Sequence, residues 1–312
     1  MYFLRALLVS LSQFVLVYGL SHLLIAFGWK LWHRHNSPST PTASANALFL
    51  LQVAPCVLAI LTVTSLTIPS FIRFEPRVGE EELGAPILLL STVCLGLFST
   101  GMLRAIRAIL GTRRATSSWF HEAIPLLSSS GQPVFESGPN TPPLVVVGLW
   151  RPTLFVSSSA SGLLNDDELR LAIAHESVHI RRHDNLKKLL LRLLNIPGNA
   201  IERFWLAAVE VDADRHAVRT KHEALSLASA LVKASKLKIP TAELAMNFNS
   251  EAADLLRLRV EHLLRWEDSS KQGQLKMWAL ASFALAGISA TLVVSYPVLL
   301  VAMHEFSELL VR

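Results

Sequence analysis

The sequence is poor in cysteine, tyrosine and charged residues. Only two cysteines, Cys56 and Cys94, occur among 312 residues, and both lie in long apolar runs. Two thiols in such places form neither a disulfide framework nor a cysteine-rich zinc site, so we interpret them as small packing residues. The three tyrosines, Tyr2, Tyr18 and Tyr296, also lie in apolar runs. We therefore do not expect a tyrosine in a catalytic site formed by the polar part of the chain.

The shortage of charge points to a membrane protein. Charged residues make up 17% of the chain, hydrophobic residues make up 51%, and the mean hydropathy is +0.41. These values are unusual for a soluble protein. The excess of apolar residues falls into four runs that each reach the roughly 20 residues needed to cross a bilayer as a helix. We therefore predict four transmembrane helices, at residues 2–28, 47–72, 83–103 and 277–303.

The first run is interpreted as a retained helix, because it is too long for a signal peptide and no small-residue cleavage site follows it. Basic residues without acidic neighbours follow the first and third runs, whereas four glutamates outnumber two arginines between the second and third. The positive-inside rule then predicts an external N-terminus and a catalytic domain in the cytoplasm, at a plasma or inner membrane. The predicted domains are residues 1–110 with three membrane helices, the cytoplasmic residues 111–275, and residues 276–312 with the fourth helix and an external tail.

The net charge of +5 does not indicate a nucleic-acid partner. Residues 111–275 contain twenty lysines and arginines and eighteen aspartates and glutamates, so the surplus belongs to the membrane flanks. Because no basic patch interleaved with aromatic residues is present, we expect no direct binding of nucleic acid.

One pentapeptide in the polar part of the chain points to metal chemistry. Residues 175–179 read His-Glu-Ser-Val-His, and positions i and i+4 of a helix lie on one face. His175 and His179 can therefore bind one Zn²⁺, with Glu176 as a general base for hydrolysis. A surface helix can carry the same five residues by chance, so the pentapeptide alone leaves both interpretations open.

The chain around the pentapeptide predicts a small sheet followed by a long helix. A short helix is expected over residues 119–127, and β-rich runs bounded by turns predict three strands, at residues 133–135, 143–147 and 152–157. The sheet could offer an edge to a substrate strand or could only cover the helices. Asn165 and Glu168 form a capping-box pattern that begins the helix.

This helix is expected to continue past His179 to a stop near residues 195–198, Asn-Ile-Pro-Gly. Its second half is basic on one face and rich in leucine on the other, a pattern that suits a membrane surface or a core helix with a solvated face. A following helix carries Glu210 and Asp214, which again share a face. A zinc site with two histidines needs a third protein ligand. Counting along two antiparallel helices, however, places Glu210 opposite Asp184, about one turn from His179.

Taken together, these residues resemble the BlaR/MecR-type integral-membrane zinc metallopeptidases. The similarity rests on Gly-Leu-Trp-Arg-Pro at residues 148–152, on His-Glu-Ser-Val-His-Ile-Arg-Arg-His-Asp at residues 175–184, and on Glu-Val-Asp-Ala-Asp at residues 210–214. It extends to the order of the membrane helices. The segment before the third ligand departs from the family pattern, since it reads Asn-Ile-Pro-Gly. Only nine residues follow Met303, so we expect no penicillin-binding sensor.

The resemblance implies a mainly α fold, with four membrane helices and a cytoplasmic α+β, zincin-like metalloprotease domain of the gluzincin type. It implies Zn²⁺ bound by His175, His179 and Glu210, with Glu176 as the general base. Asp214 would orient a ligand histidine, and Asp184 could share that role. For the donor to the oxyanion we nominate His183, one turn beyond His179. His216 lies well around the helix from Glu210, which argues against a ligand role.

We therefore expect a membrane-embedded zinc endopeptidase that cleaves a protein at the cytoplasmic membrane face, in regulated proteolysis or signalling. The expected partners are the lipid bilayer and a protein substrate, either a transcriptional repressor or the chain itself. Two alternatives remain, a quality-control protease for membrane proteins and a zinc-binding receptor or scaffold without activity. The intact Glu176 argues against the last, because structural zinc needs no general base.

Overall fold

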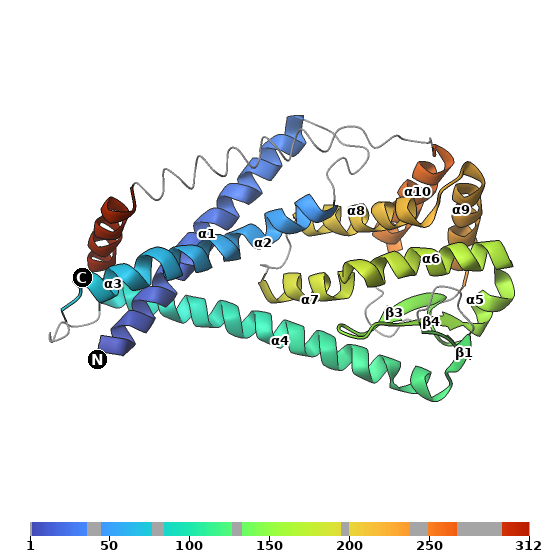
Figure 1. Cartoon of the computed structure of the whole chain (residues 1–312), viewed down its shortest axis with the longest axis horizontal. Coiled ribbons are helices and arrows are strands. Elements are labelled where there is room, and N and C mark those ends of the chain that lie inside the picture. The colour runs from blue at the N-terminus through green and yellow to red at the C-terminus, as the bar shows by residue number, and fades with distance from the viewer. Residues whose placement is uncertain are drawn as a thin grey trace. The chain divides into compact units, whose positions relative to one another are not determined.

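The computed structural model describes residues 2–35, 45–76, 84–126, 133–194, 200–237, 249–266 and 295–311. Contacts divide the chain into two compact units. The apolar unit comprises Met1–His35, Leu51–Gly101 and Ser269–Arg312, and the polar unit comprises Asn36–Leu50 and Met102–Asp268. The described part of the chain is mainly helical, with one small sheet in the polar unit (Figure 1).

Three long helical stretches are apolar enough to cross a membrane: Tyr2–Trp32, Ala45–Phe74 and Ala85–His121. The first belongs to α1 (Tyr2–His35) and the third is α4 (Ala85–His121). The second is built from α2 (Ala45–Thr62), the π-helical turn η1 (Val63–Thr67) and α3 (Ile68–Phe74). Many large apolar side chains on these helices are exposed, as expected for surfaces that face lipid.

These stretches agree with the first three predicted membrane helices and support a multi-pass membrane protein. Of the fourth predicted helix, residues 277–294 lie outside the described residues, and residues 295–303 form part of a helix at 295–311. The orientation in the membrane stays a prediction.

The π-helical turn in the second stretch lies just before a proline. Pro69 has no N–H to donate to the carbonyl of Ser65, four residues earlier. The hydroxyl of Tyr296 donates to that carbonyl instead, at 2.8 Å. The proline is thus accommodated in an apolar setting without an unsatisfied backbone acceptor at Ser65.

The sheet of the polar unit has four strands in the order β1-β2-β4-β3. They are β1 (Ile124–Leu126), β2 (Val134–Ser137), β3 (Leu144–Val147) and β4 (Thr153–Ser157). β2 and β4 are parallel, and the other two pairs are antiparallel. The three predicted strands are confirmed, whereas the predicted helix at residues 119–127 is wrong, because α4 runs on to His121 and β1 follows.

The turn between β3 and β4 depends on Gly148, which has a φ of +109°. A Cβ atom at this position would lie 2.8 Å from the carbonyl oxygen of Arg151. Only glycine adopts this conformation without strain. This explains the glycine of the Gly-Leu-Trp-Arg-Pro segment, which lies in the turn between the antiparallel strands β3 and β4.

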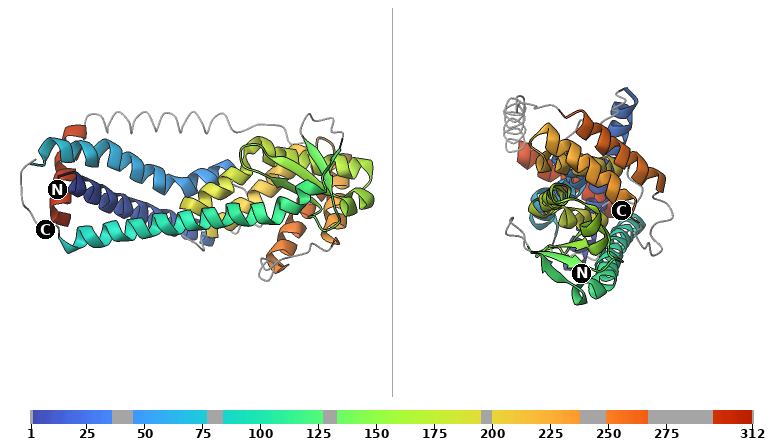
Figure 2. Two further views of the ribbon diagram at one scale, coloured as in Figure 1. Left: turned by 90° about the horizontal axis from the view of Figure 1, so that it is seen from below. Right: turned by 90° about the vertical axis from the view of Figure 1, so that its right-hand side faces the viewer.

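The helix that carries the pentapeptide, α6 (Asp166–Arg182), lies between the sheet and a group of helices. Leu169, Ile173 and Ile180 pack against a core of strand residues that includes Leu154. On another side, Leu171 joins a core formed by α9 (Lys221–Ser235) and α10 (Asn249–Leu264). Figure 2 shows the sheet against α6, and Figure 1 shows α8 (Ala200–Ala217) beside it. The short helix α5 (Ser158–Leu163) links β4 to this region.

The predicted capping box is confirmed, and it also anchors α6 to α9. The Asn165 side chain accepts from the backbone N–H of Glu168 at 2.9 Å, and the Glu168 carboxylate accepts from the backbone N–H of Asn165 at 3.0 Å. Ser229 and Lys233 of α9 donate to the same carboxylate at 2.6 and 2.7 Å. Glu168 is buried, so these four contacts fix the start of the helix.

The long helix predicted beyond His179 is in fact two helices. α6 ends at Arg182, His183 adopts the left-handed conformation with φ 54°, and α7 (Asp184–Leu194) begins at the next residue. The prediction of one continuous helix is therefore wrong, because the helix breaks at His183. The break changes the direction of the chain one turn after His179, where a straight helix would have carried Asp184 further along.

Replacement of Glu168 by alanine is expected to destabilise the protein by about 2 kcal/mol, because it removes the capping box and the contacts to α9. Urea unfolding of the detergent-solubilised protein, followed by tryptophan fluorescence, measures this change. Asp167→Asn is the matched control, since the Asp167 side chain is 64% exposed in the same helical turn. Equal stability of the two variants would contradict the role assigned to Glu168.

Candidate metal site

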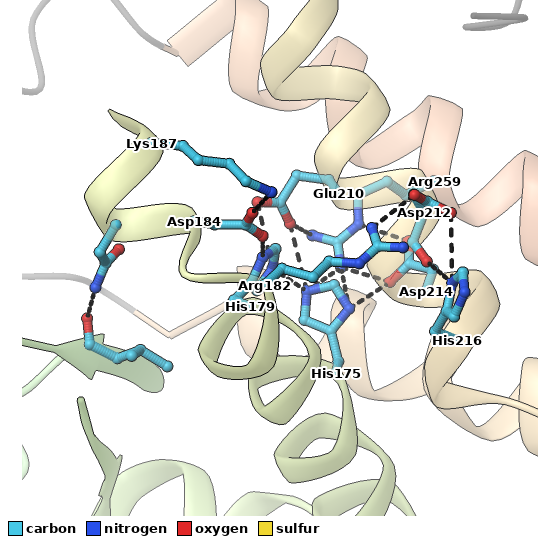
Figure 3. Close-up of polar contacts among 12 residues, drawn as sticks. His175, His179, Arg182, Asp184, Lys187, Glu210, Asp212, Asp214, His216 and Arg259 are labelled. Carbon is cyan, nitrogen blue, oxygen red and sulfur yellow. Dashed lines mark hydrogen bonds and ion pairs between the residues drawn. The ribbon is translucent and has the colours of Figure 1, made fainter. Parts of the chain in front are cut away.

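The two histidines of the pentapeptide face each other across one turn of α6. The Nε2 atoms of His175 and His179 are 3.1 Å apart, and the rings meet edge to face (Figure 3). His175 is buried, and the His179 side chain is only 10% exposed. The structure thus brings the predicted histidine pair together in a place with little exposure to solvent.

A carboxylate lies behind each histidine, on the side away from the pair. The Nδ1 atom of His175 is 2.8 Å from Asp214, and the Nδ1 atom of His179 is 2.8 Å from Asp184. Both carboxylates are buried. A carboxylate acceptor favours the imidazole tautomer with its proton on Nδ1, which leaves the lone pair of Nε2 for a metal. Asp214 and Asp184 therefore lie where the expected orienting roles require them.

Glu210 of α8 completes the cluster. Its carboxylate oxygens lie 3.4 Å from the Nε2 atom of His175 and 3.7 Å from that of His179. The three side chains are close enough to hold one metal ion. The gap of one turn expected from helix counting is absent, because that counting assumed a straight helix through His183 and because α8 packs directly against α6.

The donor set fits a divalent cation such as zinc. Two imidazole lone pairs that point at each other from 3.1 Å repel unless a proton or a cation lies between them. Burial alone would lower the pKa of His179, but hydrogen bonds to Asp184 and Glu210 and the charges of Glu210 and Glu176 outweigh it and raise that pKa to about 9. In the absence of metal a proton is therefore held at neutral pH. A bound zinc ion would replace it.

Arg259 of α10 is the residue that the sequence did not reveal. Its Nε and Nη2 atoms donate to the two oxygens of Asp214 at 2.8 and 2.7 Å, and Nη1 is 3.0 Å from Glu210 (Figure 3). Nη2 also lies 3.2 Å from the Nε2 atom of His175. Burial would raise the pKa of Asp214, but the bonds from Arg259 and His175 outweigh it and keep that pKa below its usual value.

The remaining candidates lie at different distances from the cluster. Glu176 is half-buried on α6, and its charge acts on both His179 and Arg259. His183 is exposed at the break between α6 and α7, and among the described contacts its imidazole takes no part in the cluster. His216 is also exposed, and its Nδ1–H donates to the backbone oxygen of Asp212, away from the ligand atoms. The donor role nominated for His183 therefore has no support in its position.

The residue after Asp184 connects this site to the sheet. The Asn185 side chain donates to the backbone oxygens of Val146 and Gly148 at 3.1 and 3.2 Å, at the outer edge of β3. Two consecutive residues at the start of α7 therefore hold a metal-site histidine and the sheet edge. Lys187 adds a contact to Asp184 at 3.2 Å.

A second group of ligand-type side chains lies in the apolar unit. Glu75, His304 and Glu308 bring their ligand atoms within 4.8 Å of one another. Glu75 is already paired with the buried Arg5 at 3.1 Å. This group offers one imidazole where the cluster in the polar unit offers two, so the cluster in the polar unit is the better candidate for zinc.

Residues 134–263 match the family model described as BlaR1 peptidase M56. This M56 peptidase domain contains the cluster, the sheet from β2 onwards and Arg259. The resemblance noted from the sequence motifs is thereby confirmed for this segment. No curated protein matches the chain.

The assignment of the M56 ligands predicts a simple result of metal analysis. His175→Ala and Glu210→Ala should each lower the zinc bound per purified chain, because two protein ligands do not hold zinc as tightly as three. Asp214→Asn should keep the zinc stoichiometry but lower the affinity for zinc about 10- to 100-fold in a chelator competition. His216→Ala is the control on the same helix as Glu210. Unchanged zinc in either ligand variant would remove that residue from the ligand set.

Proposed function

We propose that the protein is a membrane-embedded zinc endopeptidase that hydrolyses a protein substrate at the cytoplasmic face of the membrane. The observation that carries this proposal is the convergence of His175, His179 and Glu210 in an M56 peptidase domain. The long apolar helices support the membrane location. The positive residues beside the predicted membrane helices support the cytoplasmic face.

Zinc, held by His175, His179 and Glu210, would act as a Lewis acid toward the scissile carbonyl and lower the pKa of water. Glu176 would accept the proton of the attacking water and deliver it to the leaving amine. Asp184 and Asp214 would hold the two imidazoles in the tautomer that leaves Nε2 for the metal. The fold proposed for these roles is a zincin of the gluzincin type.

The substrate is proposed to be another protein or a segment of the chain itself, within regulated proteolysis or signalling. A transcriptional repressor is the expected class of soluble substrate, by analogy with the signalling peptidases that the motifs resemble. No direct contact with nucleic acid is needed for this role. Quality control of membrane proteins remains an alternative use of the same chemistry, and a scaffold without activity is the third.

Glu176→Gln separates an enzyme from a scaffold. The variant should retain one zinc per chain and lose cleavage by a factor on the order of 10²–10⁴, because glutamine cannot accept the proton. Rates of peptide-bond cleavage and zinc content of the purified proteins measure the two effects. Asp167→Asn, an exposed carboxylate on the same helix, should leave both unchanged. Normal cleavage by Glu176→Gln would rule out its assignment as the base.

The same variant identifies the substrate class. Proteins that accumulate or co-purify with Glu176→Gln, but not with the active protein, are the candidate substrates. One repressor, or uncut copies of the chain itself, would support signalling. A broad set of misfolded membrane proteins would support quality control instead. An identical proteome for both forms would count against any proteolytic role.

A further inference from the structure

Arg259 is a largely buried cation fixed beside the candidate ligands. Its side chain is 12% exposed, while the Asp214 carboxylate that it grips is 1% exposed. Burial would lower the pKa of the guanidinium, but Asp214 and the charges of Glu210 and Glu176 outweigh it and raise that pKa. Arg259 therefore stays charged in its place next to His175 and Glu210.

The contacts of Arg259 are of two kinds: an anchor to Asp214, and an edge of the guanidinium that faces the ligand cluster. The anchor is the two-bond fork from Nε and Nη2 to both oxygens of Asp214, a strong and directional arrangement. The anchor leaves Nη1 pointing to Glu210, which is the acceptor that Nη1 contacts among the described residues. Since Nη1 carries two hydrogens, the edge of the guanidinium beside the ligand cluster keeps donor capacity.

Arg259 and a metal ion would share one acceptor, the carboxylate of Glu210. Nη2 lies 3.2 Å from Nε2 and 3.5 Å from Nδ1 of His175, so it does not lie along the lone pair of Nε2, which stays available to a metal. The Glu210 oxygen at 3.0 Å from Nη1, by contrast, is both the acceptor of Arg259 and a candidate metal ligand. Zinc at Glu210 would compete with Nη1 for this acceptor and leave the anchor to Asp214 intact. The guanidinium edge would then need another acceptor beside the metal.

We propose that Arg259 is a catalytic residue that donates from Nη1 to the carbonyl oxygen of the scissile peptide bond. This inference rests on the proposed peptidase function. It supplies a donor from a position where neither the exposed His183 nor a tyrosine lies, since Tyr2, Tyr18 and Tyr296 belong to apolar helices.

The step assigned to Arg259 is the formation of the tetrahedral intermediate. A water oxygen forms a bond to the carbonyl carbon, and the π pair of the carbonyl moves onto its oxygen. Glu176 takes the proton of the water. When the C–N bond breaks, that pair returns to the carbonyl and the nitrogen receives the proton from Glu176. Arg259 keeps its own proton and stabilises the negative oxygen. This stabilisation is stronger in a buried site than in water.

A binding experiment with zinc-loaded protein tests this donor without relying on turnover. The probes are an N-phosphoryl dipeptide amide, whose tetrahedral oxygens resemble the intermediate, and a thiol analogue of the same dipeptide, which binds zinc through sulfur. Arg259→Gln should weaken binding of the phosphoryl compound about 10-fold or more and binding of the thiol analogue by less than about twofold. Arg259→Lys should fall between, because it keeps the charge but loses the fork.

Arg257→Gln is the matched control. Arg257 lies two residues earlier on α10, its side chain is 80% exposed, and it pairs with Glu261 at 2.9 Å. This variant should bind zinc and both probes as the unchanged protein does. Zinc content is measured for every variant before the probes are added.

Kinetics with internally quenched decapeptides of randomised sequence complete the test. Arg259→Gln should lower kcat on the order of 10²-fold with little change in KM. Equal weakening of both probes, or loss of zinc in Arg259→Gln and Arg259→Lys alike, would overturn the donor role and leave a purely structural one. Unchanged phosphoryl binding would overturn it too. If the unchanged protein cleaves no peptide, but Arg259→Gln still binds the phosphoryl compound selectively more weakly, the peptidase proposal fails and the donor assignment stands.

Discussion

The facing pair of imidazoles is the constraint on which the rest of the polar unit depends. Helix geometry alone would allow His175 and His179 to rotate away from each other. Asp214 and Asp184 prevent this by holding the outer nitrogen of each ring at 2.8 Å. The cost of burying two carboxylates is offset because each has an imidazole and a second cation, Arg259 or Lys187, within hydrogen-bond distance.

Charge balance explains why four helices meet at one place. α6 supplies the histidines, α7 and α8 supply carboxylates, and α10 supplies Arg259 (Figure 3). Burial raises the pKa of Glu210, but its bonds to the histidines and the charge of Arg259 outweigh this effect and hold that pKa well below its ordinary value. An ionised Glu210 is the form that binds a metal. The site can therefore be assembled before a metal arrives, with Arg259 beside the ligand atoms.

Local patterns predicted those features whose causes are local. The pentapeptide spacing, the capping box at Asn165 and the strands around Gly148 each depend on neighbours within a few residues. The break at His183 was missed because a histidine with positive φ carries no sequence signal. Arg259 was missed for a different reason. It lies in an amphipathic segment beside Arg257, and only the packing of α10 on α8 decides which arginine is largely removed from solvent.

Asp184 and Asn185 share one peptide bond, yet they serve two separate structures. Asp184 holds His179, while Asn185 occupies two backbone oxygens at the outer edge of β3. Insertion or deletion of a single residue at this point would turn one of these side chains by about 100° around α7. The His179 ring and the edge of β3 therefore depend on one common register of α7. A polypeptide that pairs with β3 would meet Asn185 in the first turn of α7, the same turn whose Asp184 sets the direction of the His179 ring.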